Sequence, residues 1–139
     1  KLLLIVEPGT PEGYARLMRW KEIALLEGCG LLAPCPLGAE SCPLQNDWCA
    51  FAARAERSAL HRRMKGGSLP YEDEKFGFIA LAKGELNLPA ARIRRHPVKQ
   101  KGFVELAVCR AGLAESLRVP KSAGESYRAA RKAGQGDAW

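Results

Sequence analysis

The chain has 139 residues and a hydrophobic content of 47%, which suits one domain with a single core and excludes wholesale disorder. No apolar run approaches the roughly 20 residues that a membrane-spanning helix needs, and the run at residues 2–6 is too short for a secretory signal. The formal net charge of +7 indicates a polyanionic partner. Because the chain begins with Lys rather than Met, we expect further protein upstream.

The N-terminal part has the pattern of a strand, a helix and a second strand. The continuous apolar run Leu2–Val6 predicts a strand that is covered on both faces in a parallel sheet. Thr10 and Pro11 predict the start of a helix that continues to about Glu27. A second strand at residues 31–32 would complete one right-handed crossover unit of an α/β fold.

The next segment holds Cys35, Cys42 and Cys49 at even intervals, with Cys29 before it and Cys109 far downstream. An odd number of cysteines, with no sign of export, disfavours a disulfide framework and favours a metal site in a reducing compartment. Zinc ligands usually come in tight pairs, which this chain lacks. Wide spacing with a remote fourth cysteine is typical of iron–sulfur clusters. On the residues alone, a cluster, a structural zinc and the burial of small thiols all stay open.

The rest of the chain predicts a mixture of helices and strands. Asp47 can cap a helix from Trp48 to about Lys65, which would place Cys49 in a first turn whose N–H groups stabilise a thiolate. After it we expect, in order, an acidic turn that neutralises nearby arginines, a strand, a β-hairpin broken at a proline, a short strand and a basic helix, at residues 72–74, 76–82, 92–109, 117–119 and 122–132.

Basic side chains gather in three acid-poor stretches at residues 54–65, 92–101 and 128–132. We expect them to bind RNA phosphates, with a solvated helix face as the alternative for the first stretch. The candidate RNA-binding residues are Arg54, Arg57, Lys65, Arg92, Arg94, Arg95, Lys99, Lys101, Arg128, Arg131 and Lys132. The sequence has no G-x-G phosphate turn and no Ser-His-Asp or Cys-His pattern, so it identifies no catalytic residue.

Several motifs together resemble one family along essentially the whole chain. They are VEPGTPEG, APCP, CPL, DWCAFAAR, RSALHRRMKGG, YEDEKF, RRHPVKQKGFVELAVC and GESYRAARKAGQGDAW. The chain resembles the mitochondrial and bacterial methyltransferase-like proteins of the small ribosomal subunit, often described as ribosomal RNA methyltransferases.

The resemblance implies a ligand set and a fold. Cys35, Cys42, Cys49 and Cys109 would hold a [4Fe-4S] cluster, with zinc as the alternative ion. The implied fold is α/β: the C-terminal portion of a Rossmann-like class I methyltransferase with a cysteine-ligated cluster insertion and a β-hairpin. Its regions would be a strand–helix–strand unit, the iron–sulfur region, and a basic C-terminal strand and helix, at residues 1–33, 34–110 and 111–139.

The resemblance leaves two functions open. One is an assembly factor of the small ribosomal subunit that binds ribosomal RNA and ribosomal proteins; the other is an active S-adenosylmethionine-dependent ribosomal RNA methyltransferase. The S-adenosylmethionine cradle would lie upstream, so we expect no methyl transfer by these residues alone. Glu7, Pro8 and Gly9 are candidate cofactor contacts, because open α/β folds bind ligands at the carboxyl ends of strands. We expect a monomer in the bacterial cytoplasm or the mitochondrial matrix, with no membrane partner.

Overall fold

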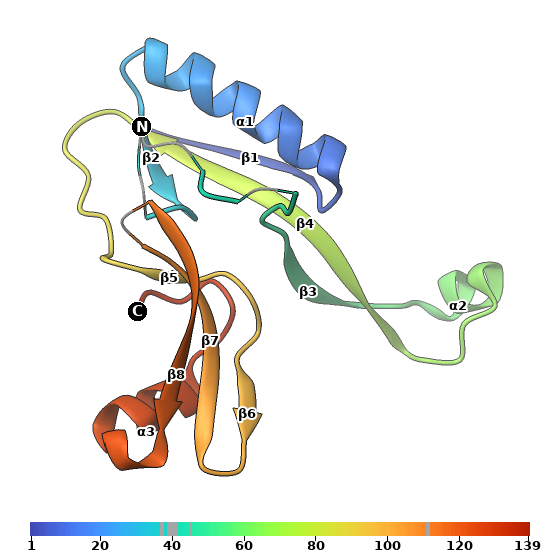
Figure 1. Ribbon diagram of the computed structural model, residues 1–139. Coiled ribbons are helices and arrows are strands. Elements are labelled where there is room, and N and C mark those ends of the chain that lie inside the picture. The colour runs from blue at the N-terminus through green and yellow to red at the C-terminus, as the bar shows by residue number, and fades with distance from the viewer. Residues whose placement is uncertain (37, 39–41, 45, 111) are drawn as a thin grey trace.

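The structure is a computed structural model that describes residues 1–36, 38, 42–44, 46–110 and 112–139. The described residues form two antiparallel sheets, each packed against one helix (Figure 1). The strands are β1 (Leu2–Pro8), β2 (Gly30–Ala33), β3 (Phe51–Glu56), β4 (Tyr71–Ala82), β5 (Arg92–Ile93), β6 (Val98–Gln100), β7 (Phe103–Arg110) and β8 (Leu113–Pro120). The helices are α1 (Pro11–Leu26), α2 (Ala59–Lys65), α3 (Glu125–Lys132) and a short 3-10 helix at Lys121–Ala123. Within these ranges, no helix combines the length and apolar character needed to cross a membrane.

The first sheet is built around the long strand β4. β1 pairs along one edge of β4, while β2 and β3 pair with opposite ends of its other edge. Because β1 and β2 both run antiparallel to β4, they are parallel to each other with β4 between them. The predicted order of strand, helix and strand is confirmed, and so is the helix start, where Thr10 Oγ1 accepts a hydrogen bond from the Gly13 N–H at 3.1 Å. Leu17 of α1 packs on this sheet in a buried cluster with Leu31, Ile79 and Leu81.

β1 differs from its prediction. Its partner is the antiparallel strand β4, and the side chains of Leu2, Leu3, Leu4 and Val6 are each more than half exposed. The expectation of a strand covered on both faces in a parallel sheet is therefore wrong for the described residues. A continuous apolar run predicts extended backbone, but it does not specify the direction of the partner strand. The Rossmann-like fold stays a prediction.

The helix predicted from Trp48 to Lys65 is also wrong. The chain instead forms β3, then a turn, then the short helix α2, which Ser58 caps through a hydrogen bond from His61 N–H to Ser58 Oγ. The reason is a set of contacts with a distant part of the chain. β3 pairs with the first half of β4 over six residue pairs, and Phe51 joins Phe76 and Phe78 in an aromatic cluster. This pairing outweighs the helix propensity of the alanines and arginines.

The second sheet surrounds β7, which pairs with β5, β6 and β8. The predicted alternation of β7 is confirmed, because Val104, Leu106 and Val108 are fully buried beneath Ala130 of α3, while Glu105 is exposed. The predicted hairpin at residues 92–109 is confirmed in its pairing of β5 with β7, but its first arm is two short strands, β5 and β6, on either side of Pro97. β8 is longer than the predicted strand at residues 117–119, because it pairs with the whole of β7.

β3, α2 and the first half of β4 form an arm that projects from the first sheet (Figure 1). α2 lies at its tip and has no buried residues. The acidic residues Glu72, Asp73 and Glu74, predicted to form a turn, lie instead within β4 on this arm. The arm therefore presents basic and acidic side chains on the two strands of one hairpin.

Candidate metal centre

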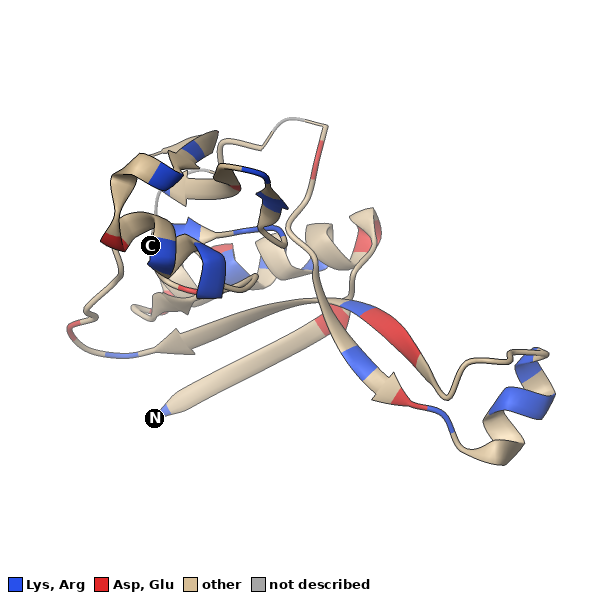
Figure 2. Cartoon of the chain, turned by 90° about the horizontal axis from the view of Figure 1, so that it is seen from below, with Lys and Arg blue, Asp and Glu red and all other residues tan. Residues whose placement is uncertain are grey.

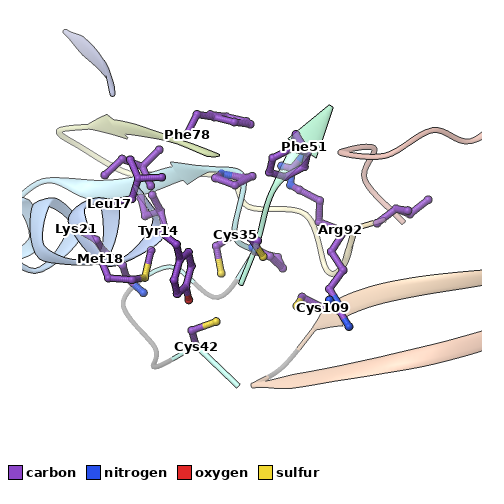
Figure 3. A pocket seen from close by; sticks show the side chains of 17 residues that line it. Tyr14, Leu17, Met18, Lys21, Cys35, Cys42, Phe51, Phe78, Arg92 and Cys109 are labelled. Carbon is purple, nitrogen blue, oxygen red and sulfur yellow. The ribbon is translucent and has the colours of Figure 1, made fainter. Parts of the chain in front are cut away.

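Four cysteines line one cavity between the two sheets. They are Cys35 just after β2, Cys42 and Cys49 in the segment before β3, and Cys109 in β7. The cavity has a volume of about 50 Å³, which exceeds the space of roughly 10–15 Å³ that one water molecule needs. Figure 3 shows Cys35, Cys42 and Cys109 around this space. The fifth cysteine, Cys29, packs against the core beneath α1 and does not line the cavity.

Residues distant in sequence meet here because each is fixed by a different element. Cys109 is 5% exposed and is held in β7 by pairing with Arg92 on one side and Ala114 on the other. Cys49 lies two residues before β3 and is not in a helix, so the expected stabilisation of its thiolate by a helix terminus is wrong. The centre thus joins the first sheet, the segment before β3 and the second sheet.

The thiols are close enough to affect one another electrostatically. Burial, and then the thiols of Cys109, Cys42 and Cys35, raise the pKa of Cys49 to about 12, against a smaller lowering by Arg94. Burial and the thiols of Cys35 and Cys42 raise the pKa of Cys109 to about 11, again against Arg94. Without a bound cation these two groups are protonated at neutral pH. Metal binding here would therefore release protons.

Tyr14 of α1 contributes a hydroxyl to the same cavity. Burial raises the pKa of Tyr14, and so does its hydrogen bond with Cys42. The phenol therefore stays protonated, and Figure 3 shows its hydroxyl pointing toward the Cys42 sulfur. A protonated hydroxyl in this position can donate a hydrogen bond to a thiolate ligand.

Cationic side chains also line the cavity. Lys21 is 7% exposed although it lies in the first helix, and Arg92 and Arg94 line the opposite wall. Each of these arginines has a buried Nε that finds no hydrogen-bond partner among the described residues. A buried polar group without a partner calls for an explanation such as a bound ion. Thiolates with a net negative charge would complement this set of cations.

Within the described residues, no group of three or more His, Cys, Asp or Glu side chains is placed to hold a metal ion. The four cysteines share a cavity, but their sulfurs do not form a closed set around one point. The assignment of metal ligands therefore stays a prediction. What the structure adds is that all four predicted ligands, and not Cys29, line the same space.

Three of the predicted RNA-binding residues are engaged in ion pairs on the arm. Arg54 binds Asp73 at 2.9 Å, while Arg57 and Lys65 both bind Glu72. The hydrogen bond from Arg57 is the largest cause that lowers the pKa of Glu72 to about 2. The expectation that the acidic residues neutralise nearby arginines is confirmed, and these cations are correspondingly less available to RNA.

The arginines in and just after β5 also have partners within the chain. Arg94 and Arg95 both bind Asp47, at 3.0 and 2.8 Å, and Arg92 donates a hydrogen bond to the Gly136 carbonyl oxygen at 2.7 Å. Asp47 was expected to cap a helix. Its carboxylate does accept a hydrogen bond from the N–H of the next residue, but its ion pairs are with the two arginines.

Other predicted RNA-binding residues are exposed to solvent. Lys99 and Lys101 lie on the hairpin between β6 and β7, and α3 carries a further three, Arg128, Arg131 and Lys132. Arg63 of α2 is equally exposed and Arg62 beside it is partly exposed, but neither was among the predicted residues. Figure 2 shows basic residues on both helices. The sequence signal for Arg62 and Arg63 is the basic run HRRMK, which has no acidic residue next to it.

The candidate cofactor loop makes structural contacts. Glu7 binds Arg16 at 2.7 Å, and that hydrogen bond is the largest cause that lowers the pKa of Glu7. Gly9 packs against the backbone of Lys75, to whose carbonyl oxygen its N–H donates at 3.0 Å. The Gly9 carbonyl oxygen accepts the indole N–H of Trp48 at 3.1 Å. These contacts explain the residue types without a bound cofactor.

A comparison with protein families completes this picture. Residues 1–139 match the family described as mitochondrial small ribosomal subunit Rsm22. This chain belongs to that family. No curated protein matches the chain closely enough to be named as a relative.

The expected relation to the small ribosomal subunit is confirmed at the level of the family. The methyltransferase-like character and the cluster stay predictions. One residue of the centre, Lys21, was missed although the sequence holds a signal for it: it lies four residues after Leu17 and seven after Tyr14, on the apolar face of α1. A lysine on the apolar face of a helix is seldom buried unless its ammonium group is paired.

We expect Asp47→Asn to destabilise the protein by about 1 kcal/mol, because it leaves two arginines without their shared carboxylate. Burial raises the pKa of Asp47, but hydrogen bonds from Arg95, the Trp48 N–H and Arg94 outweigh it, so the pKa lies below its ordinary value of 3.8. The stabilisation is therefore complete at neutral pH and is lost as the pH falls below 3.8 and through the lower folded pKa. Urea unfolding of both proteins across this range measures the difference.

The matched control is Asp73→Asn, which removes the more exposed ion pair with Arg54. We expect a smaller loss there, since both partners are more than half exposed and surface ion pairs contribute little. An equal loss in the two variants, or a difference at Asp47 that does not change with pH, would contradict the role given to Asp47.

Proposed function

We propose that this chain belongs to an assembly factor of the small ribosomal subunit that binds ribosomal RNA and carries a [4Fe-4S] cluster. Cys35, Cys42, Cys49 and Cys109 would hold the cluster. The observation that carries the proposal is the convergence of these four cysteines on one cavity in a chain of a small-ribosomal-subunit family. A family of the mitochondrial small ribosomal subunit supports a place in the mitochondrial matrix, with ribosomal proteins as further neighbours.

We favour a cluster over one zinc ion because the resemblance implies a cluster and because the cysteines lack the tight pairs that zinc sites usually use. Four thiolates around a single zinc, with Zn–S bonds of about 2.3 Å, would lie about 3.8 Å from one another. In the described residues the four thiols line one cavity without closing on a single point. The cations Lys21, Arg92 and Arg94 would offset the negative charge of the thiolates. When bound, the cluster would supply a covalent link between the two sheets.

The contacts of the loop at residues 7–9 favour RNA binding over methyl transfer as the function. Glu7 is held by Arg16, and the backbone of Gly9 is packed against Lys75 with both its polar groups engaged. In the described residues this leaves the loop no free carboxylate for the ribose of S-adenosylmethionine. The methyltransferase reading stays the second candidate on the resemblance alone.

RNA binding would rest on the exposed cations rather than on the paired ones. Lys99→Gln with Lys101→Gln should weaken binding of small-subunit RNA and lower the slope of log affinity against log salt by about one to two, since each phosphate contact releases a counterion. A salt titration with purified, anaerobically handled protein measures both effects. Iron content should not change, because neither lysine lines the cavity.

Arg54→Gln is the matched control, because Arg54 is bound to Asp73 and should change RNA affinity less. An affinity for small-subunit RNA that does not depend on salt, or that the lysine variants leave unchanged, would exclude this mode of binding. Arg94 is unsuitable for such a test. It lines the cysteine cavity, so its replacement would change two properties at once.

A further inference from the structure

We propose that a second cavity, which we name the Trp48 cleft, binds one unpaired nucleotide of RNA. The inference rests on the proposed RNA-binding function and assigns to it a site and a substrate class. The residues that would contact the nucleotide are Gly9, Trp48, Lys75, Arg95, His96 and Gln135. None of these was among the predicted RNA contacts except Arg95.

The cleft lies beside the cysteine cavity, and Phe51 lines both. Trp48 lines the cleft while Cys49 lines the cavity, and Arg95 lines the cleft while Arg94 lines the cavity. The volume of the cleft is about 540 Å³, within the range of roughly 300–1,000 Å³ for small-molecule sites. A nucleotide is of that size. A base that is paired in a duplex could not enter a cleft of this kind.

The charge of the cleft favours a phosphate. Lys75 of β4 and Arg95 and His96 after β5 bring cationic or titratable side chains to it from two segments, and all three are exposed. Among the described lining residues Asp47 is the one acid, and both of its oxygens are bound by arginine. Because Arg95 is itself paired with Asp47, the positive charge that the cleft offers a phosphate comes mainly from Lys75.

Trp48 provides an aromatic surface that is held in place. Its indole N–H donates to the Gly9 carbonyl oxygen at 3.1 Å, and its backbone N–H donates to Asp47 Oδ1 at 2.9 Å. Stacking on a fixed aromatic ring is how proteins bind unpaired bases without strong sequence preference. The side-chain amide of Gln135 donates to the carbonyl oxygens of Ala50 and Arg94, which fixes another part of the wall beside the ring.

The test uses the 139-residue chain, purified anaerobically, and a short oligouridylate as the probe. We expect the oligonucleotide to quench tryptophan fluorescence, and Trp48→Phe to remove that quenching while Trp20→Phe, on the exposed face of α1, retains it. Lys75→Gln should weaken binding several-fold and lower the salt slope by about 0.7, the loss of one contact to single-stranded phosphate. Lys83→Gln, an exposed lysine outside the cleft, should bind as the unaltered chain does.

Three competitors decide the ligand class. The oligouridylate annealed to oligoadenylate, free uridine monophosphate and polyglutamate should each compete much less well than the single strand. Equal competition by the duplex, the free nucleotide or the acidic peptide would overturn the assignment to an unpaired RNA nucleotide. Equal effects of Lys75→Gln and Lys83→Gln would overturn the cleft while leaving RNA binding elsewhere on the chain intact. Absence of all RNA binding would overturn the proposed function together with the cleft.

Discussion

Cys109→Ala should purify without iron, as completely as Cys35→Ala. Cys109 comes from the second sheet, whereas the other three cysteines of the cavity precede β3. If it is a ligand, its removal leaves three thiolates and opens the covalent link between the sheets. Iron content after anaerobic purification, together with urea unfolding, measures both consequences.

The expected effect on stability is large because the loop is long. Residues 50–108 lie between Cys49 and Cys109, and closing such a loop in the unfolded chain costs roughly 4 kcal/mol. Metal binding can offset that cost, since structural sites contribute about 10 kcal/mol or more. A cysteine that is only buried would cost about 1 kcal/mol on replacement by alanine.

Cys29→Ala is the internal control, because Cys29 packs against the core beneath α1 and does not line the cavity. It should retain the metal and lose only a small part of the free energy of unfolding. Full iron content in Cys109→Ala would defeat the four-cysteine assignment.

Gly13→Ala should destabilise the protein by about 2–3 kcal/mol, opposite in sign to the usual result in a helix. Replacing glycine by alanine inside a helix normally stabilises it by about 1 kcal/mol. Gly13 lies in the first turn of α1, where an added Cβ would overlap the carbonyl oxygen of Pro8. Either α1 or the end of β1 must move, and the hydrogen bond from Gly13 to Thr10 Oγ1 is strained with it.

Gly134→Ala is the matched control, since its Cβ would meet only Asp137 Oδ2, at an ordinary distance of 3.6 Å. Chemical denaturation of the two variants compares them directly. A gain in stability at Gly13, or equal changes at the two sites, would show that the close approach of α1 to Pro8 is not maintained in solution.

Local signals in the sequence were reliable where a feature depends on neighbouring residues. The cap at Thr10 and the proline after it are of this kind, because side chains a few residues apart determine them. The alternation of β7 likewise followed from its own residues, and it places Val104 and Leu106 in the core.

Features that depend on distant partners were not predictable. The segment AFAARAER has good helix formers, yet it forms β3 because β4 offers it a paired edge and an aromatic cluster. Asp47 has the chemistry of a helix cap, but Arg94 and Arg95 bind it from another part of the chain. From the sequence alone, Arg54 and Arg57 are predicted to contact RNA. In the structure, acidic residues of β4 bind both of them.

The candidate metal centre was predictable from the sequence only in part. Spacing alone left a cluster, a zinc ion and simple burial open, and the resemblance named four ligands. The positions of Cys109 and Cys35 depend on strand pairing with distant residues: β7 pairs with β5, and β2, just before Cys35, pairs with β4. Lys21 was available from helical periodicity, since it shares a face with Leu17, whereas the inward position of Arg92 and Arg94 depends on the second sheet.

The nature of the bound metal tests the account most directly. The chain should be purified anaerobically and analysed for iron, acid-labile sulfide and zinc, with its visible absorbance recorded. We expect iron and sulfide in equal amounts, with a broad band from thiolate-to-iron charge transfer that is lost in Cys35→Ala and kept in Cys29→Ala. One zinc per chain with no sulfide and no visible band would contradict it.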